Sequence, residues 1–432
     1  MTVGAAAPAG GGRSPRGLSG RAAWVMADQA VSSLANAGLS VVVARSVPAV
    51  EFGAFALAFT VYSLVVAVSQ SLGAQVVVIR FSGVTGTPWR LAVSAATGTA
   101  LAVGLLGATV VLPVAAWLPP PMRDVLLAMA VLLPALTLQD TWRTVFVARG
   151  TPRQAFVNDA LWALLQACLL GGLVAAGVAT VVWFVAGWGI AAVVAAAWGV
   201  RQSRVLPSSA VRPFLRDHRD VVGPILATTL ASMGATQVAF LLIASTGGIE
   251  VVGALRAAQT LLGPLNIVGF ALSSFTVPEV VRREMSRRAL IRVSLVLSGV
   301  LVAVDLAWGC VLLLLPDSVG TFLLGATWPG ARAALPGLVV FTALLGAMVG
   351  ASAVIRALAR TSYVFWTGAA LGLLLLVLPG TGAAVAGVQG AAWGFAAAAL
   401  GVVPLSWWLL VRAVRAGASG VPLTASGGAH VD

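Results

Sequence analysis

The stretch RQSRVLPSSAVRPFLRDHR at residues 201–219 decides the fold, because it is the longest and most highly charged connection between apolar segments. Five of its residues are arginine, whereas only 9% of the whole chain is charged. Six apolar segments precede this stretch and six follow it. Since a helix that spans a membrane needs roughly 20 apolar residues, the stretch divides the chain into two halves of six helices.

The composition of the whole chain is that of a membrane protein. The chain has 432 residues, 59% of them hydrophobic, and a mean hydropathy of +1.00. A soluble domain carries roughly 25% charged residues, so soluble enzymes, secreted disulfide scaffolds and nucleic-acid binders are disfavoured. We predict an all-α polytopic membrane protein with about 12 transmembrane helices. The expected spans are 22–44, 53–79, 91–118, 122–148, 154–178, 180–200, 220–245, 251–280, 290–315, 333–357, 362–385 and 388–411.

The arginines give the expected orientation. All 26 basic residues are arginine. Alternate connections, together with the two ends of the chain, carry 21 of them, and the remaining connections carry only Arg45, Arg123 and Arg332. Cytoplasmic loops are enriched in arginine, so both termini are expected in the cytoplasm and the protein in the cell membrane.

The chain is expected to consist of five parts with distinct composition. They are a disordered basic leader (1–20), an N-terminal bundle (21–200), a cytoplasmic linker (201–219), a C-terminal bundle (220–412) and a disordered tail (413–432). The two bundles share short similarities, such as EFGAFALA at 51–58 and EVVGALRA at 250–257. Two halves of like orientation indicate a parallel pseudo-repeat with a substrate path between them.

Polar residues follow one face of several predicted helices, where lipid-facing helices would be apolar all round. The first helix carries Asp28, Gln29 and Asn36 on one face, and the eighth carries Arg256, Gln259 and Asn266. The first two helices of each half are therefore expected to line a cavity. The alternative is hydrogen bonding between helices without transport.

Arg256 is the most informative of these residues, because an unpaired arginine in a span costs at least ~2.5 kcal/mol. Two interpretations stay open: it pairs with Glu250 at the outer surface, or it faces a central pocket and binds an anion. Arg143 also lies in a span, and Asp140 one turn earlier predicts a local ion pair.

Asp28, Asp159 and Asp305 have no basic residue within a helical turn. An isolated carboxyl group in a span can bind and release a proton, so all three are candidates for coupling to a proton or cation gradient. No metal site or cofactor is predicted.

The segment DQAVSSLANAGLSVVVARSVPAVEFGAFALAFTVYS at 28–63 resembles the first helix pair of polysaccharide flippases of the multidrug/oligosaccharidyl-lipid/polysaccharide exporter superfamily. Residues 253–283 are similar to the eighth helix of that family, and residues 323–340 to its turn into the tenth.

The resemblance implies a transporter, not an enzyme, that flips a polyprenyl-diphosphate-linked oligosaccharide from the inner to the outer leaflet by alternating access. Such a function serves exopolysaccharide, capsule or cell-envelope glycan assembly, with membrane lipids and glycan-assembly enzymes as partners. The resemblance implies that Arg45 and Arg256 contact the diphosphate or glycan. The cavity is then lined by Asp28, Gln29, Asn36, Gln259 and Asn266.

Besides a non-transporting scaffold or signalling protein, two other functions remain open at this point. A drug or cation antiporter of the same fold would use intramembrane carboxylates such as Asp28, Asp159 and Asp305. A polytopic glycan polymerase or glycosyltransferase belongs to a different class and needs catalytic side chains on a sizeable outer loop, whereas the outer loops expected here are short and nearly uncharged.

Overall fold

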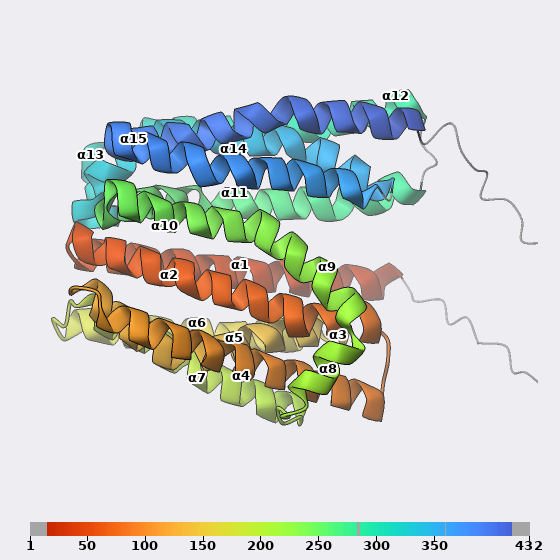
Figure 1. Cartoon of the computed structure of the whole chain (residues 1–432), viewed down its shortest axis with the longest axis horizontal. Coiled ribbons are helices and arrows are strands. Elements are labelled where there is room, and N and C mark those ends of the chain that lie inside the picture. Colours follow the sequence, from red (N-terminus) through yellow and green to blue (C-terminus); the bar gives the residue numbers. More distant parts are fainter. Residues whose placement is uncertain (1–14, 283–285, 359, 417–432) are drawn as a thin grey trace, which may run out of the picture.

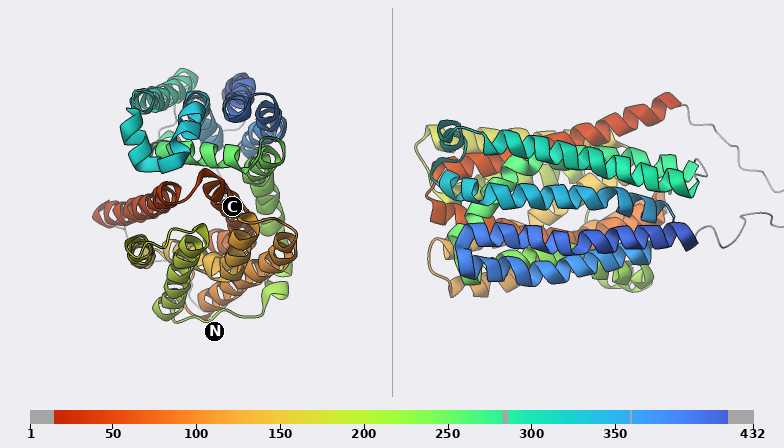
Figure 2. Two further views of the ribbon diagram at one scale, coloured as in Figure 1. Left: turned by 90° about the vertical axis from the view of Figure 1, so that its left-hand side faces the viewer. Right: turned by 90° about the horizontal axis from the view of Figure 1, so that it is seen from above.

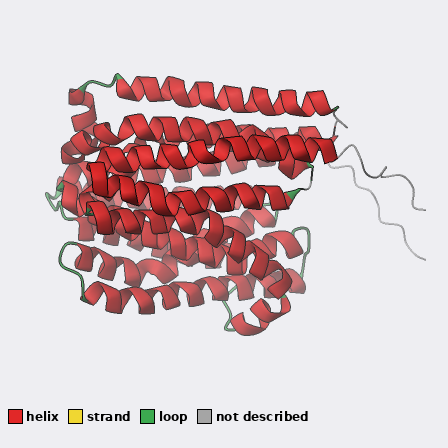
Figure 3. Ribbon diagram, turned by 45° about the horizontal axis from the view of Figure 1, so that its top comes forward, coloured by secondary structure: helices red, strands yellow, loops and turns green. Residues whose placement is uncertain are grey.

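The computed structural model describes residues 15–282, 286–358 and 360–416, apart from the side chains of 15–19, 21, 22, 232, 266–282, 361 and 416. Helices are the only regular secondary structure in this described part (Figure 3). Most of the expected leader and tail lies outside it. The first helix already begins at Pro15, and the last extends to Ala416.

The N-terminal half contains six long rods. They are α1 (Pro15–Ser46); α2 (Ala49–Ser69), which continues through the π-helical turn η1 (Gln70–Ala74) into α3 (Gln75–Phe81); α4 (Thr87–Ala116); α5 (Met122–Ala148); α6 (Pro152–Ala175); and α7 (Val181–Ser203). Each rod exceeds the roughly 20 residues that cross a hydrocarbon core.

The C-terminal half follows a short linker helix, α8 (Val211–Asp217). Its elements are α9 (Arg219–Thr229), which continues through η2 (Leu230–Gly234) into α10 (Ala235–Gly247); α11 (Ile249–Arg282); α12 (Arg287–Leu313); α13 (Asp317–Leu324) with η3 (Gly325–Thr327); α14 (Trp328–Ala357); and α15 (Thr361–Ala416). α15 turns back on itself at Ala386 and Gly387, where Gly387 adopts φ +55°. The described rods therefore number twelve.

The predicted fold class is confirmed: the chain is an all-α membrane protein of two six-helix halves. Eight described helices are long and apolar enough to cross a membrane. The predicted spans agree with the rods to within several residues at most ends. The short helices α8 and α13 were not predicted, because they are below the length of a span.

The rods lie side by side along one axis, and the two halves form two groups when viewed along it (Figures 1 and 2). The arginine-rich connections and α8 lie at one end, and α13 lies at the other (Figure 1). Following the arginine asymmetry, we refer to these as the cytoplasmic end and the outer end.

The two halves meet most closely at the outer end, where α2 and α11 pack against each other. A Cβ atom on Gly53 would lie 2.3 Å from the carbonyl oxygen of Ile249, and one on Gly253 would lie 3.0 Å from the Cα atom of Gly53. A Cβ atom on Gly53 would clash with this backbone, and one on Gly253 would be unusually tight, so this outer seam between Gly53 and Gly253 favours residues without side chains.

We predict that Gly53→Ala forces the outer seam apart and lowers the free energy of unfolding by roughly 1–3 kcal/mol, as overpacking does. A thermal melt of the purified protein in detergent measures the effect. Gly38→Ala on α1 is the matched control, since a Cβ atom there meets nothing within 4 Å; it should leave the melting temperature unchanged or raise it. Equal melting temperatures for the two variants would contradict the seam.

Candidate functional site

A cavity of about 730 Å³ lies between the two halves. Its wall comes from α1 and α2 of the N-terminal half and from α11, α12 and α14 of the C-terminal half. The polar lining residues are Ser33, Asn36, Ser40, Arg256, Gln259, Thr260, Asp305 and Thr342, and the aromatic ones are Phe52, Phe55, Phe59 and Phe341. The cavity thus has the position expected of a substrate path between two repeats.

The prediction that helices one, two and eight line a cavity is confirmed. The seventh helix (α9–η2–α10) contributes none of the described wall residues, whereas α12 and α14 do so unexpectedly. On α14 the wall residues are mostly apolar, for example Leu338 and Leu345. Because α14 has no polar stripe, its sequence did not indicate that it lines the cavity.

Arg256 lies in the cavity wall and is held by neutral groups. Its Nη2 atom donates to Thr60 Oγ1 on α2 and to Gln237 Oε1 on α10, both at 2.9 Å, and its guanidinium lies 4.1 Å from the ring centroid of Phe240. Nη1 donates to Gln259 at 3.4 Å.

No carboxylate of the described chain forms an ion pair with Arg256, so the interpretation that it pairs with Glu250 is wrong. A positive charge in the cavity wall whose direct partners are all neutral favours an anionic ligand.

Asp305 of α12 lies in the same wall and is 7% exposed. It forms no hydrogen bond or ion pair with any described residue. A Cβ atom on Gly346 of α14 would lie 2.6 Å from Asp305 Oδ2. The missing side chain at Gly346 therefore gives the carboxyl group its space beside the cavity.

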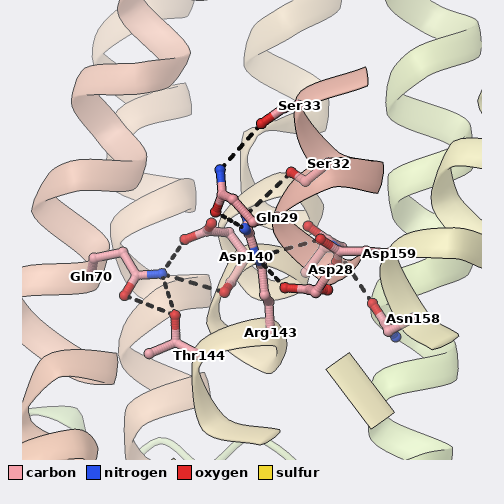
Figure 4. A network of polar contacts seen from close by, with 11 residues as sticks. Asp28, Gln29, Ser32, Ser33, Gln70, Asp140, Arg143, Thr144, Asn158 and Asp159 are labelled. Carbon is pink, nitrogen blue, oxygen red and sulfur yellow. Dashed lines mark hydrogen bonds and ion pairs between the residues drawn. The ribbon is translucent and has the colours of Figure 1, made fainter. Parts of the chain in front are cut away.

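A polar network connects the helices of the N-terminal half around Arg143 (Figure 4). The Nε atom of Arg143 on α5 lies 3.0 Å from Asp28 Oδ2 on α1 and 3.4 Å from Asp159 Oδ2 on α6. Nη2 donates to Gln29 at 2.8 Å, and Nη1 donates to Ser32 at 3.2 Å. One guanidinium thus binds three helices together.

Asp140 has different partners from those expected. Instead of pairing with Arg143, it accepts a hydrogen bond from Gln70 of η1, whose Nε2 atom also donates to Thr144 Oγ1 at 2.9 Å. The predicted local ion pair is therefore wrong, and Asp28 and Asp159, although they have no basic residue within a helical turn, are not isolated carboxyl groups. Their partner comes from another helix, which spacing along one helix cannot show.

Carboxyl groups outnumber cations here: Asp28 and Asp159 pair with the one guanidinium, and Asp140 is bound by Gln70 instead (Figure 4). Asp28 Oδ1 is buried without a hydrogen-bond partner. Because an uncompensated buried charge is costly, this network is chemically suited to take up a proton. In the described part no three His, Cys, Asp or Glu side chains gather closely enough to hold a metal ion.

The remaining predicted site residues are dispersed. Asn36 and Gln259 line the cavity with Arg256, but Gln29 lies in the Arg143 network. Arg45 is exposed at the outer end of α1, 4.2 Å from the ring centroid of Phe322. The side chain of Asn266 lies outside the described residues. The roles of all these residues stay predictions.

No family model matches the sequence, and no curated protein matches it either. Solved structures do match. An inward-facing multidrug resistance MATE family transporter of the MOP superfamily has a TM-score of 0.69 at 14% identity, covering 91% of this chain and 99% of the other. The lipid II flippase MurJ in an inward closed conformation has a TM-score of 0.71 at 12% identity, covering 90% and 88%.

An outward-facing MATE family transporter matches with a TM-score of 0.60 at 15% identity, covering 94% of this chain and 97% of the other. The chain therefore has the fold that the MOP superfamily uses for transporters and flippases.

We predict that Arg143→Gln lowers the free energy of unfolding by about 3 kcal/mol or more, because it leaves two buried carboxyl groups without their cation. Thermal melts in detergent measure this loss. Arg123→Gln is the control: Arg123 pairs with Asp124 at the surface, where an ion pair is worth about 0–1 kcal/mol.

Adding Asp28→Asn to Arg143→Gln should restore part of the lost stability, since one of the two unpaired carboxylates disappears. If Arg143→Gln melts at the temperature of Arg123→Gln, the network does not stabilise the N-terminal half.

Proposed function

We propose that this protein is a flippase that moves a polyprenyl-diphosphate-linked oligosaccharide from the inner to the outer leaflet of the cell membrane by alternating access. The fold supports a membrane transporter. The observation that carries the proposed substrate class is the position of Arg256, whose guanidinium lies in the wall of the cavity between the halves with neutral partners only.

The chemistry of the cavity suits such a substrate. A diphosphate forms strong, charge-assisted hydrogen bonds with a guanidinium, and Asn36 and Gln259 offer amide groups to sugar hydroxyls. A cavity of about 730 Å³ has the volume of a typical small-molecule site. It can therefore hold the diphosphate and the first sugars, while the polyprenyl tail stays in the lipid.

Alternating access requires the halves to separate at the outer end after loading. The outer seam at Gly53 and Gly253 closes that end, and the match to inward conformations supports a state that loads from the cytoplasm. Glycan-assembly enzymes on either side of the membrane are the proposed partners, because they make and consume such a substrate.

An antiporter for cationic drugs is the second candidate, and Asp305 favours it. This carboxyl group lies in the cavity wall without a described partner, and it could balance the charge of a bound cation. The structures that share this fold are transporters and a flippase, so a glycan polymerase or glycosyltransferase is not proposed.

We predict that Arg256→Gln slows flipping of a fluorescent polyprenyl-diphosphate oligosaccharide in proteoliposomes by about tenfold or more. The reason is that hydrogen bonds to a charged group are worth about 1.5–3 kcal/mol. Arg256→Lys should retain part of the rate, and the surface variant Arg123→Gln should match the unmodified protein. An unchanged flipping rate in the Arg256→Gln variant would contradict the proposed substrate class.

The same proteoliposomes separate the two candidates. If the unmodified protein takes up a cationic dye in exchange for protons but does not flip the labelled lipid, the antiporter is the correct assignment and the flippase is not. In cells, loss of the protein should make lipid-linked oligosaccharide accumulate on the inner leaflet.

We predict that Asp305→Asn makes transport insensitive to an imposed proton or sodium gradient, because the amide cannot exchange a proton or neutralise a cation. Initial rates with and without the gradient measure the effect. The variant should keep its melting temperature, since Asp305 has no partner to lose. Asp124→Asn, at the surface, serves as the control. A gradient dependence that survives in Asp305→Asn would exclude this residue from coupling.

A further inference from the structure

A second pocket, of about 220 Å³, lies at the cytoplasmic end of the N-terminal half, away from the cavity of Arg256. It is formed where the start of α4, the end of α5 and the end of α7 meet. Each of these three elements contributes one exposed arginine: Arg90, Arg149 and Arg204. We propose that this pocket binds the phosphate group of an anionic phospholipid of the inner leaflet.

The three arginines carry no counter-charge. None of them forms an ion pair with a described carboxylate, whereas Arg80 and Arg216, near the same end of the bundle, pair with Asp220 and Asp217. Three like charges around one small pocket repel each other. A bound phosphate removes this repulsion.

The helix ends favour Arg149 and Arg204, and Arg90 contacts one of these ends through the carbonyl oxygen of Arg204. Arg149 and Arg204 are the residues at which α5 and α7 end, and a helix C-terminus favours a cation. Arg90 lies at the start of α4, where the helix favours an anion instead. A phosphate in the pocket would accept further hydrogen bonds from the guanidinium of Arg90, which otherwise donates to the carbonyl oxygen of Arg204.

The backbone at Arg204 adopts the left-handed helical conformation. Arg204 has φ +54°, and it is the one non-glycine residue of the described chain with a positive φ, a conformation that L-residues disfavour. Its carbonyl oxygen accepts a hydrogen bond from Arg90 Nη2 at 3.3 Å.

The linker after Arg204 is fastened to α4 by Ser94. Its hydroxyl group donates to the carbonyl oxygen of Leu206 at 2.6 Å, and its carbonyl oxygen accepts from the amide of Ser208 at 2.9 Å. These contacts hold Arg204 beside Arg90, so the convergence of the arginines is built into the fold.

The position of the pocket at the cytoplasmic end of the bundle favours a lipid over a soluble phosphate. Trp89, Val93 and Phe146 line the pocket next to the arginines. Tryptophan is enriched at the level of lipid headgroups, and the inner leaflet is anionic. The exposed guanidinium groups meet the phosphate, and the three apolar side chains, each at most 5% exposed, close the pocket behind it.

The test measures binding of phosphatidylglycerol to the purified full-length protein in neutral detergent. Arg90→Gln, Arg149→Gln and Arg204→Gly each remove one guanidinium, and glycine accepts the positive φ at position 204 without strain. Each substitution should weaken the Kd by about tenfold, as expected for a lost hydrogen bond to a charged group. Arg212→Gln, at an exposed position of the same linker outside the pocket, should change the Kd less than twofold.

Three results would overturn the proposal. Equal weakening by Arg212→Gln would show general attraction between charges. Equal affinity for zwitterionic phosphatidylcholine would remove the anionic specificity. Displacement of the lipid by millimolar inorganic phosphate would identify a soluble anion as the occupant. Melting temperatures of the variants within a few degrees of the unmodified protein establish that a lost affinity is not unfolding. Since none of these residues lines the cavity of Arg256, each result leaves the proposed function unaffected.

Discussion

The ion pairs that the guanidinium of Arg143 forms with Asp28 and Asp159 are the interaction on which the N-terminal half depends. A charge among apolar helices is tolerated only when it is paired and hydrogen-bonded, and here the pairing connects α1, α5 and α6. The network extends to α7, because Asn158 of α6 donates to the carbonyl oxygen of Ala195 at 2.9 Å. Separation of α1, α5 or α6 from the other two would expose a buried charge, so these three helices behave as one unit.

The two buried arginines therefore have opposite roles. Arg143 forms ion pairs with Asp28 and Asp159, which neutralise its charge inside the protein. Arg256 is held by an amide, a hydroxyl group and an aromatic ring, which position the guanidinium without neutralising it. Only the second arrangement leaves a positive charge for a ligand, and it lies at the junction of the halves rather than within one of them.

Much of the fold follows from the sequence, because helix length and apolarity decide what crosses a membrane and the arginines decide the orientation. The side-chain contacts between helices cannot be predicted from the sequence in the same way. Arg143 lies 115 positions from Asp28, and Arg256 lies 196 from Thr60, so no local spacing connects them. Asp140 and Glu250 were the nearest acids along the chain, and neither pairs with the arginine for which it was proposed. The contribution of α14 was missed for a related reason, since its cavity residues resemble those of any apolar helix.

The hydrogen bond from Arg256 to Thr60 also crosses from one half to the other, because Thr60 belongs to α2 and Arg256 to α11. A guanidinium has a fixed set of donors, so a diphosphate that takes the Nη2 donor competes directly with this bridge. Ser71 and Thr229 form a second bridge, at 2.9 Å, but this one contains no charge and does not line the cavity. Under the proposed function, binding of the anion thus weakens one of the bridges that hold the halves together, and it does so near the outer seam, where the halves have to separate to release the substrate.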